Sequence, residues 1–328
     1  MTASGVSRYR KIAGITVGAV IFLILVGAVV RMTGSGMGCP DWPKCFGQWI
    51  PPTDISELPP DYKTRFQVAG KEIADFDAFK TWVEYTNRLI GVLIGFFAIL
   101  TFVAAVPLRQ KYQKVFRLSL AGLLLIIVQG GIGAYVVRTN LETGTITIHM
   151  VMALIILAVF IFAFLQSYRS EIKSYQTDIR SEVNFLLWIG LGVLVLSMIQ
   201  IMLGTQVRES IDLVAKELGE AERENWIDKL GFGYNIHKFF YYIVVGSILY
   251  WYYKLRPFFD SVRPLKYLTF LMIGVVGLEI LLGLGMHHLG IPPVFQPLHL
   301  LFATILFGLE LSLTGFLYLM RNQEKNDF

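Results

Sequence analysis

The sequence contains few charged residues. Asp, Glu, Lys and Arg make up 16% of the 328 residues, whereas hydrophobic residues make up 55% and the mean hydropathy is +0.57. Soluble domains usually carry about 25% charged residues, so an ordinary soluble fold is excluded. The first apolar run lacks the features of a cleaved signal peptide. It is long, and it leads into Arg31-Met-Thr-Gly-Ser-Gly rather than into a small-residue cleavage site. No Arg-rich transit segment precedes this run, which favours a bacterial membrane.

Long apolar runs are what the sequence has in abundance. A membrane-spanning helix needs about 20 predominantly apolar residues. The run that starts at Phe239 reaches this length only if its helix begins near Asn235. The pattern predicts an all-α integral membrane protein with eight transmembrane helices, over Ile12–Val30, Val83–Val106, Leu118–Val137, Thr145–Phe164, Phe185–Val207, Phe239–Tyr253, Tyr267–Met286 and Leu298–Leu319.

Lys and Arg are distributed unevenly between the connecting segments. The short segments 108–117 and 254–266 are rich in basic residues, whereas the longer segments 32–82 and 208–234 have a lower basic density. Cytoplasmic loops carry the excess of Lys and Arg, so we expect both termini in the cytoplasm of a multi-pass protein in the bacterial cytoplasmic (inner) membrane. The net charge of +5 follows from this bias and requires no nucleic-acid partner.

The chain has the pattern of an internal repeat. It divides near 168–184, and the halves 1–167 and 168–328 each contain four spans. Two span ends place a Gln four residues before a Gly and an Arg within five residues after it: Gln129, Gly133 and Arg138 in VQGGIGAYVVRTN, and Gln200, Gly204 and Arg208 in IQIMLGTQVRES. The first span ends in a looser echo that includes Arg31. This predicts two pseudo-repeated four-helix bundles.

Two outer segments are not part of the repeat. Residues 32–82 are rich in Pro, Gly and aromatic residues. Within 208–234, residues 209–231 place apolar side chains at helical spacing, at Leu213, Val214, Leu218 and Trp226. This spacing predicts a short amphipathic helix on the outer surface. A solvated loop is the alternative.

Three of the five histidines stand at matching positions. His149, His237 and His299 each open a span that runs from the outside to the inside. The remaining span in that direction opens with EYTNRLIG, which aligns Asn87 with His237 and Arg88 with Lys238. Asn87 therefore occupies a histidine position. The alternative for any one His is packing within a polar helix end.

The histidine pattern favours haem over other metals. His237 and His299 could face each other in the second bundle, and two neutral imidazoles suit low-spin haem iron. They are too few for a closed zinc site, and no carboxylate cluster accompanies them as in di-iron proteins. Cations at the outer ends of spans are candidates for the haem propionates, with snorkelling at the interface as the alternative: Arg31, Arg88, Arg138, Arg208 and Lys238.

The first half differs from the second because it combines His149 with Asn87 and Glu84. Residues three apart share a helix face, so Glu84 and Asn87 can face the same cavity. A haem held by His149 alone would have a weak or open second axial side, and Glu84 could move protons there. The alternative is a self-neutralising pair between Glu84 and Arg88.

Four motifs resemble the haem A synthase family, the eight-span enzymes of cytochrome oxidase assembly. They are GAVVRMTGSGMGCPDWPKCFGQWIPP, EYTNRLIG, GTQVRESID and PVFQPLHLLFA. The resemblance covers nearly the whole chain, and TGSGxxCPDWPxCxGxxIP is its most specific part. The family oxidises the C8 methyl of haem O to the formyl group of haem A, and has a substrate-haem half and a b-type-haem half.

The resemblance implies roles for individual residues. Glu84 matches the glutamate of the family's E-x-x-H motif, which methyl oxidation requires. His149 matches a ligand of the substrate haem, and His237 and His299 match the b-haem ligands. Asn87 departs from the family pattern, which has His there, and this puts bis-His ligation of the substrate haem in doubt.

The only two cysteines, Cys39 and Cys45, lie on the predicted outer side, where disulfides persist. The resemblance implies a disulfide between them near the substrate haem, either redox-active or purely structural. It also implies two protein partners, the farnesyltransferase that makes haem O and a haem-copper oxidase, and leaves the oligomeric state open. His287 and His288 are given no role.

Two other classes of protein fit part of the pattern. A di-haem membrane electron carrier would explain the histidines, but not Glu84, the difference between the halves or the cysteine loop. A haem transporter or chaperone could use the same repeat with haem as its cargo.

Overall fold

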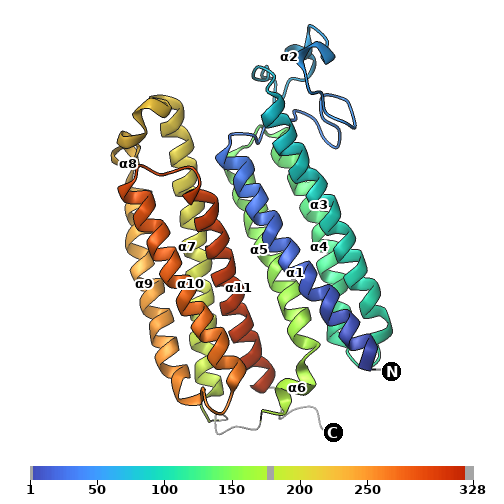
Figure 1. Ribbon diagram of the computed structural model, residues 1–328, viewed down its shortest axis with the longest axis vertical. Helices are drawn as coiled ribbons and strands as arrows, with labels where there is room; N and C mark the ends of the chain where they lie inside the picture. Colours follow the sequence, from blue (N-terminus) through green and yellow to red (C-terminus); the bar gives the residue numbers. More distant parts are fainter. Residues whose placement is uncertain (1–2, 176–180, 322–328) are drawn as a thin grey trace. The chain divides into compact units, whose positions relative to one another are not determined.

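The computed structural model describes residues 3–175 and 181–321 and is built from helices (Figure 1). This confirms the predicted all-α class, since the described ranges contain two isolated bridges but no β-strand. Residues 176–180 of the predicted linker between the halves lie outside the described residues. The long helices are α1 (Ala3–Met32), α3 (Ala78–Ala105), α4 (Gln113–Arg138), α5 (Thr143–Gln166), α7 (Val183–Leu218), α9 (Phe232–Leu255), α10 (Arg263–His288) and α11 (Phe295–Arg321).

Within the described residues, seven helices are long and apolar enough to cross a membrane. They are α1, α3, α4, α5, α7, α10 and α11, and they make this a multi-pass membrane protein. Helix α9 has 24 residues, but its tyrosines and its polar first turns make it less apolar than the other seven. Seven of the eight predicted apolar runs fall inside one of the long helices, and the run Val83–Val106 ends one residue beyond α3, in η2 (Val106–Leu108).

Short elements connect or extend the long helices. Residue preferences at the helix starts are the usual ones: the Asp77 side chain accepts the N–H of Lys80 at 3.1 Å at the start of α3. Pro297 lies in the first turn of α11, where the backbone N–H groups have no partner within the helix, so the N–H that proline lacks costs no hydrogen bond. The short elements are η1 (Ile55–Glu57), α2 (Tyr62–Arg65), η2 (Val106–Leu108), α6 (Arg169–Lys173), η4 (Glu220–Asn225), α8 (Trp226–Lys229) and η5 (Arg256–Phe258).

The first of two compact units comprises Met1–Leu108 and Phe116–Val159. Hydrogen bonds between side chains tie its helices together inside an otherwise apolar interior. Thr16 on α1 and Thr101 on α3 join through their hydroxyls at 2.8 Å. The Tyr9 hydroxyl on α1 lies 2.9 Å from Oγ of Ser119 on α4. Buried polar groups in lipid need such internal partners.

The second unit comprises Arg109–Val115 and Phe160–Phe328. Its helices α7, α9, α10 and α11 pack together (Figure 1). They surround a continuous apolar core that includes Trp251, Met272 and Leu313, all fully buried. Gly190 permits close packing, because a Cβ there would lie 2.6 Å from the Trp251 ring. Glu310 is also fully buried and accepts a hydrogen bond from Ser197 at 2.8 Å.

The segment between α1 and α3 forms a small folded cap. Its core is aromatic: Phe46 makes edge contacts with Tyr62, Phe66 and Phe76. A capping box at Asp54 and Glu57 fixes η1, and hydrogen bonds from Thr53 hold the pKa of Glu57 below its ordinary value. This cap positions the cysteine loop described below.

The predicted amphipathic helix over 209–231 is not a separate element. Helix α7 continues without a break to Leu218, and η4 and α8 follow it. Leu213 does not pack against the rest of the protein, since its exposed fraction is 68%. Val214 and Trp226 are buried, in a cluster with Val207, Ile211, Leu230 and Ile291. Contacts made after the chain turns back at Gly219 therefore decide which face is covered.

Candidate haem sites

Glu84 lies in the second turn of α3, and its side chain is buried against the cysteine loop. Its Oε2 accepts the backbone N–H of Cys39 at 2.8 Å, and its Oε1 pairs with Arg88 one turn later on the same helix. Both carboxylate oxygens therefore have partners. These contacts bring Glu84 together with Cys39 and Arg88, and in the described ranges none joins it to Asn87 or His149.

Arg88 binds the backbone of the cysteine loop. Its guanidinium donates to the carbonyl oxygens of Asp41 at 2.6 Å, Lys44 at 2.9 Å and Cys39 at 2.9 Å. The ion pair with Glu84 uses a fourth N–H. An arginine has five N–H donors. The side chain is thus engaged in holding the loop on α3, which leaves little capacity for a haem propionate.

The disulfide between Cys39 and Cys45 is confirmed, and both cysteines are fully buried. The loop it closes touches the first turn of α3 directly, since the Thr81 hydroxyl donates to the carbonyl oxygen of Gly38 at 2.9 Å. A Cβ at Gly38 would lie 2.3 Å from the carbonyl oxygen of Lys80. Only glycine permits this approach, so the loop sits at a fixed distance from Glu84.

We expect Gly38→Ala to loosen the cysteine loop. The added methyl group must push the loop away from the α3 backbone, at a cost of about 1–3 kcal/mol. Thermal unfolding in detergent should show a lower Tm, and limited proteolysis should cut the segment 33–77 faster. Gly95→Ala on the same helix is the matched control, because a Cβ at Gly95 meets no atom within 4 Å. Equal Tm values for the two variants would contradict the close contact.

His149 lies near the start of α5, against α4. The side-chain amide of Gln129 donates to its backbone carbonyl at 3.0 Å. A Cβ at Gly133 would lie 3.4 Å from Cε1 of the imidazole, so the glycine leaves room for the ring. Nδ1 of His149 is buried without a hydrogen-bond partner among the residues the structure describes.

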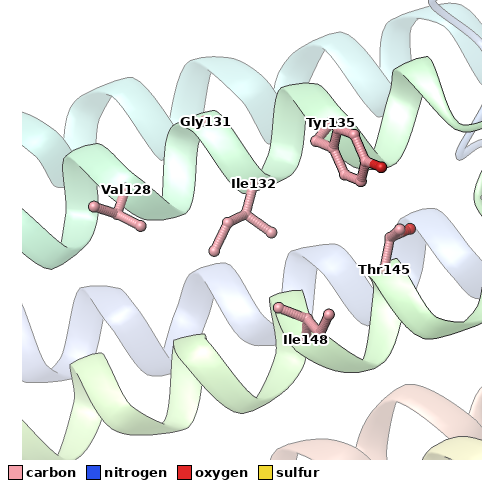
Figure 2. Close-up of a pocket in the computed structure, with 6 residues that line it drawn as sticks. All are labelled: Val128, Gly131, Ile132, Tyr135, Thr145 and Ile148. Atoms are coloured by element: carbon pink, nitrogen blue, oxygen red, sulfur yellow. The ribbon is translucent and has the colours of Figure 1, made fainter.

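An apolar groove of about 300 Å³ lies between α4 and α5 beside His149. Figure 2 shows Val128, Gly131, Ile132 and Tyr135 lining it from α4, and Thr145 and Ile148 lining it from α5. Ile148 and Ile132 are the sequence neighbours of His149 and Gly133. His149 itself is not among the residues that line the groove, whose walls are apolar apart from the side-chain hydroxyls of Tyr135 and Thr145.

His237 on α9 repeats the arrangement of His149. The amide of Gln200 on α7 donates to its backbone carbonyl at 3.1 Å. A Cβ at Gly204 would lie 3.1 Å from Cε1 of the ring, and Nδ1 is buried without a partner in the described part of the chain.

His299 on α11 faces α10 in the same unit. A Cβ at Gly283 would lie 4.0 Å from Cε1 of its ring. Its Nδ1 lies 2.9 Å from Oε2 of Glu279, which is buried.

Asn87 occupies the corresponding place in the pair α1 and α3. Its side-chain oxygen is buried and has no hydrogen-bond partner in the described ranges. Gly27 precedes Arg31 by four residues, as Gly204 precedes Arg208, and a Cβ at Gly27 would meet nothing within 4 Å. In the other three helix pairs the edge of an imidazole lies beside the corresponding glycine, whereas the space beside Gly27 is open.

The other predicted cations differ in their surroundings. Arg138 and Lys238 are exposed at helix ends, and Arg208 pairs with Asp212 on the same face of α7. Nζ of Lys238 lies 3.4 Å from Nε2 of His287, whose Nδ1 is 2.8 Å from the Tyr234 hydroxyl.

The sequence analysis assigned no role to His287 and did not single out Glu279. His287 follows Gly283 by four residues, as Arg208 follows Gly204, and Glu279 precedes Gly283 by four, as Gln200 precedes Gly204. The same spacing that revealed the two glutamines could have revealed both.

Buried imidazoles without hydrogen-bond partners are expensive in an apolar interior, and coordination to a metal would satisfy them. The residues present therefore fit haem: neutral ring nitrogens at matching helix starts, with cations at the same helix ends. Fold and site together define a multi-pass helical membrane protein with histidine sites of the kind that bind haem.

The sequence profile of the COX15-CtaA family, described as cytochrome oxidase assembly protein, matches residues 10–311. The chain belongs to this family.

Several curated relatives are named heme A synthase. The protein from Shewanella oneidensis is 26% identical over 222 residues, which are 66% of this chain and 62% of that protein. The Wolbachia pipientis wMel protein is 27% identical over 57% of this chain and 56% of its own length. The protein from the Wolbachia of Culex pipiens is 31% identical over 57% of this chain and 59% of its own length. The matched region thus spans less than two thirds of each relative.

Proposed function

We propose that this protein is a haem A synthase, a membrane oxidoreductase that converts the C8 methyl of haem O into the formyl group of haem A. The observation that carries the proposal is the placement of Glu84. A buried carboxylate at the end of a membrane helix is costly. This carboxylate binds the loop that the disulfide closes, and Glu84 lies about one helical turn from Asn87, which occupies a histidine position. Neither a simple electron carrier nor a transporter requires this arrangement.

The second half, residues 168–328, is proposed to bind a b-type haem through His237 and His299. When bound, this haem supplies one-electron transfer. The protein's own part is to hold two neutral imidazoles facing one another and to exclude water from them. Helices α7 and α10 supply the glycines that make room for the rings.

The first half, residues 1–167, is proposed to bind haem O as the substrate. His149 would hold the iron of this haem through its imidazole, and Asn87, at the remaining histidine position of this half, offers no imidazole to it. The apolar groove beside His149 is suited to an apolar part of the substrate. Forming a formyl group from a methyl group and water releases protons and an equal number of electrons. The electrons are proposed to leave to an external electron acceptor, and Glu84 is proposed to accept protons.

The cations are proposed to have different tasks. Arg88 holds the cysteine loop and Glu84 in place, a role that its four hydrogen bonds favour over propionate binding. Arg138, Arg208 and Lys238 stay candidates for propionates. The Cys39–Cys45 disulfide is proposed to keep the loop folded over the head of α3.

The membrane arrangement completes the proposal. Helix α9 is proposed as an eighth span, so that each half forms a four-helix bundle and both termini lie in the cytoplasm of a bacterium. The proposed protein partners are the farnesyltransferase that supplies haem O and the haem-copper oxidase that receives haem A.

The test is haem extraction after co-expression of the full chain with a source of haem O. Mass analysis should find haem A, or its hydroxylated precursor, together with haem B. That result would also show that Asn87 suffices at a histidine position. Haem B with unchanged haem O would instead identify a di-haem carrier, and unchanged haem O as the only haem would identify a transporter or chaperone.

A further inference from the structure

The same three-residue arrangement occurs in three helix pairs. A polar residue and a glycine four positions later on one helix face a histidine near the start of the next long helix. The three sets are Gln129, Gly133 and His149; Gln200, Gly204 and His237; and Glu279, Gly283 and His299. In each set the glycine faces the edge of the imidazole ring.

The polar residue does something different in the third set. Gln129 and Gln200 donate from their amide groups to the backbone carbonyl of the histidine, so they fix the helix and leave the ring unbound. Nδ1 of His149 and Nδ1 of His237 accordingly have no partner in the described residues. Glu279 has no N–H to donate, and its Oε2 lies 2.9 Å from Nδ1 of His299 instead.

Oε2 of Glu279 lies within hydrogen-bonding distance of Nδ1 of His299, although an N–H on that nitrogen does not point straight at the oxygen. A carboxyl oxygen at Nδ1 holds the proton on that nitrogen and leaves the Nε2 lone pair for a metal. It also makes Nε2 a stronger electron donor than an imidazole without such a partner.

We propose that Glu279 is the positioning residue of the b-type haem, acting through His299 to make the two axial ligands unequal. His299 is the stronger donor, and His237, whose Nδ1 has no partner among the described residues, is the weaker. A stronger axial donor stabilises the oxidised iron, so Glu279 lowers the reduction potential of this haem. The inference rests on the proposed function, because it requires a haem between His237 and His299.

The test is a redox titration of the purified full-length protein, monitored by the absorption of its b-type haem. Glu279→Gln keeps the shape of the side chain and recreates the residue found at the two equivalent positions. We expect the variant to keep its haem and to favour the reduced form about tenfold more than the wild type. For a one-electron couple this corresponds to a rise in midpoint potential of about 59 mV.

Glu310→Gln is the matched control. It also removes a carboxyl group that is buried in the same unit, but Glu310 bonds to Ser197 and lies three turns along α11 from His299. Its midpoint potential should stay at the wild-type value. An equal shift in both variants would overturn the proposal, because it would reflect the general loss of a buried carboxyl group.

Unchanged potential and spectrum in Glu279→Gln would also overturn the proposal. If that variant loses its haem, Gln200→Glu decides, because it offers a carboxyl oxygen to the free Nδ1 of His237. Its potential should fall, and an unchanged value would contradict the inference. A wild-type protein without b-type haem would instead refute the proposed function.

Discussion

Replacing either His237 or His299 with alanine should abolish the low-spin b-type spectrum of the purified protein. Each imidazole would hold the haem iron from one helix, and the other two histidines of the second unit in the described ranges, His287 and His288, stand at the C-terminal end of α10, where His287 contacts Tyr234 and Lys238. We expect the b-haem content per protein to fall close to zero. Optical spectra of the reduced protein, with haem quantified after extraction, measure this loss.

His288→Ala is the control for this experiment. His288 ends α10 and contacts His287 rather than either proposed ligand. It should leave the b-type spectrum unchanged. A normal low-spin spectrum in His237→Ala or His299→Ala would refute the paired-ligand assignment, whereas loss in all three variants would indicate general misfolding.

Glu84→Ala should eliminate haem A production while the b-type haem remains. Removal of a general acid or base typically slows a reaction by about 10²–10⁴-fold. Extraction of haem from cells that also make haem O gives the ratio of haem A to haem O, and the spectrum of haem B reports on the second unit. Haem A at the wild-type level would contradict the catalytic assignment.

Because Glu84 also binds the cysteine loop, a second variant must separate the two tasks. Arg88→Met removes the hydrogen bonds to Asp41, Lys44 and Cys39 but keeps the carboxylate. If Glu84 moves protons, Glu84→Gln should lose far more haem A than Arg88→Met, although Arg88→Met loosens the loop more. Equal losses that follow proteolysis of the loop would assign Glu84 to loop anchoring alone.

The positions of the histidines along their helices were predictable, because the thickness of a membrane sets the length of a spanning helix. Apolar runs of spanning length set where helices begin and end, and His149, His237 and His299 each fall in the first turns of such a run. The helix in the remaining matching place, α3, carries Asn87. The four-residue spacing between Gln200 and Gly204 likewise places both residues on one face of their helix.

The cysteine loop was less predictable. Its two cysteines indicated a disulfide, but nothing in the spacing of Arg88 indicates that its guanidinium binds three backbone carbonyls. The sequence offered a pair with Glu84 or a haem propionate as its partner. Every residue has a backbone carbonyl, so the residue types do not indicate which carbonyls accept hydrogen bonds from Arg88. Only the folded structure shows this contact.

The sequence alone determined that this is an all-helical membrane protein whose motifs resemble those of the haem A synthase family, because hydropathy, helix-end residues and a long specific motif are all local properties of the chain. Tertiary structure decided the rest. It merged residues up to Leu218 into α7, and it bound Glu84 and Arg88 to the cysteine loop. It also placed Glu279 on the ring of His299 rather than on its backbone. Such contacts join residues far apart in the chain, and their geometry depends on how the helices pack.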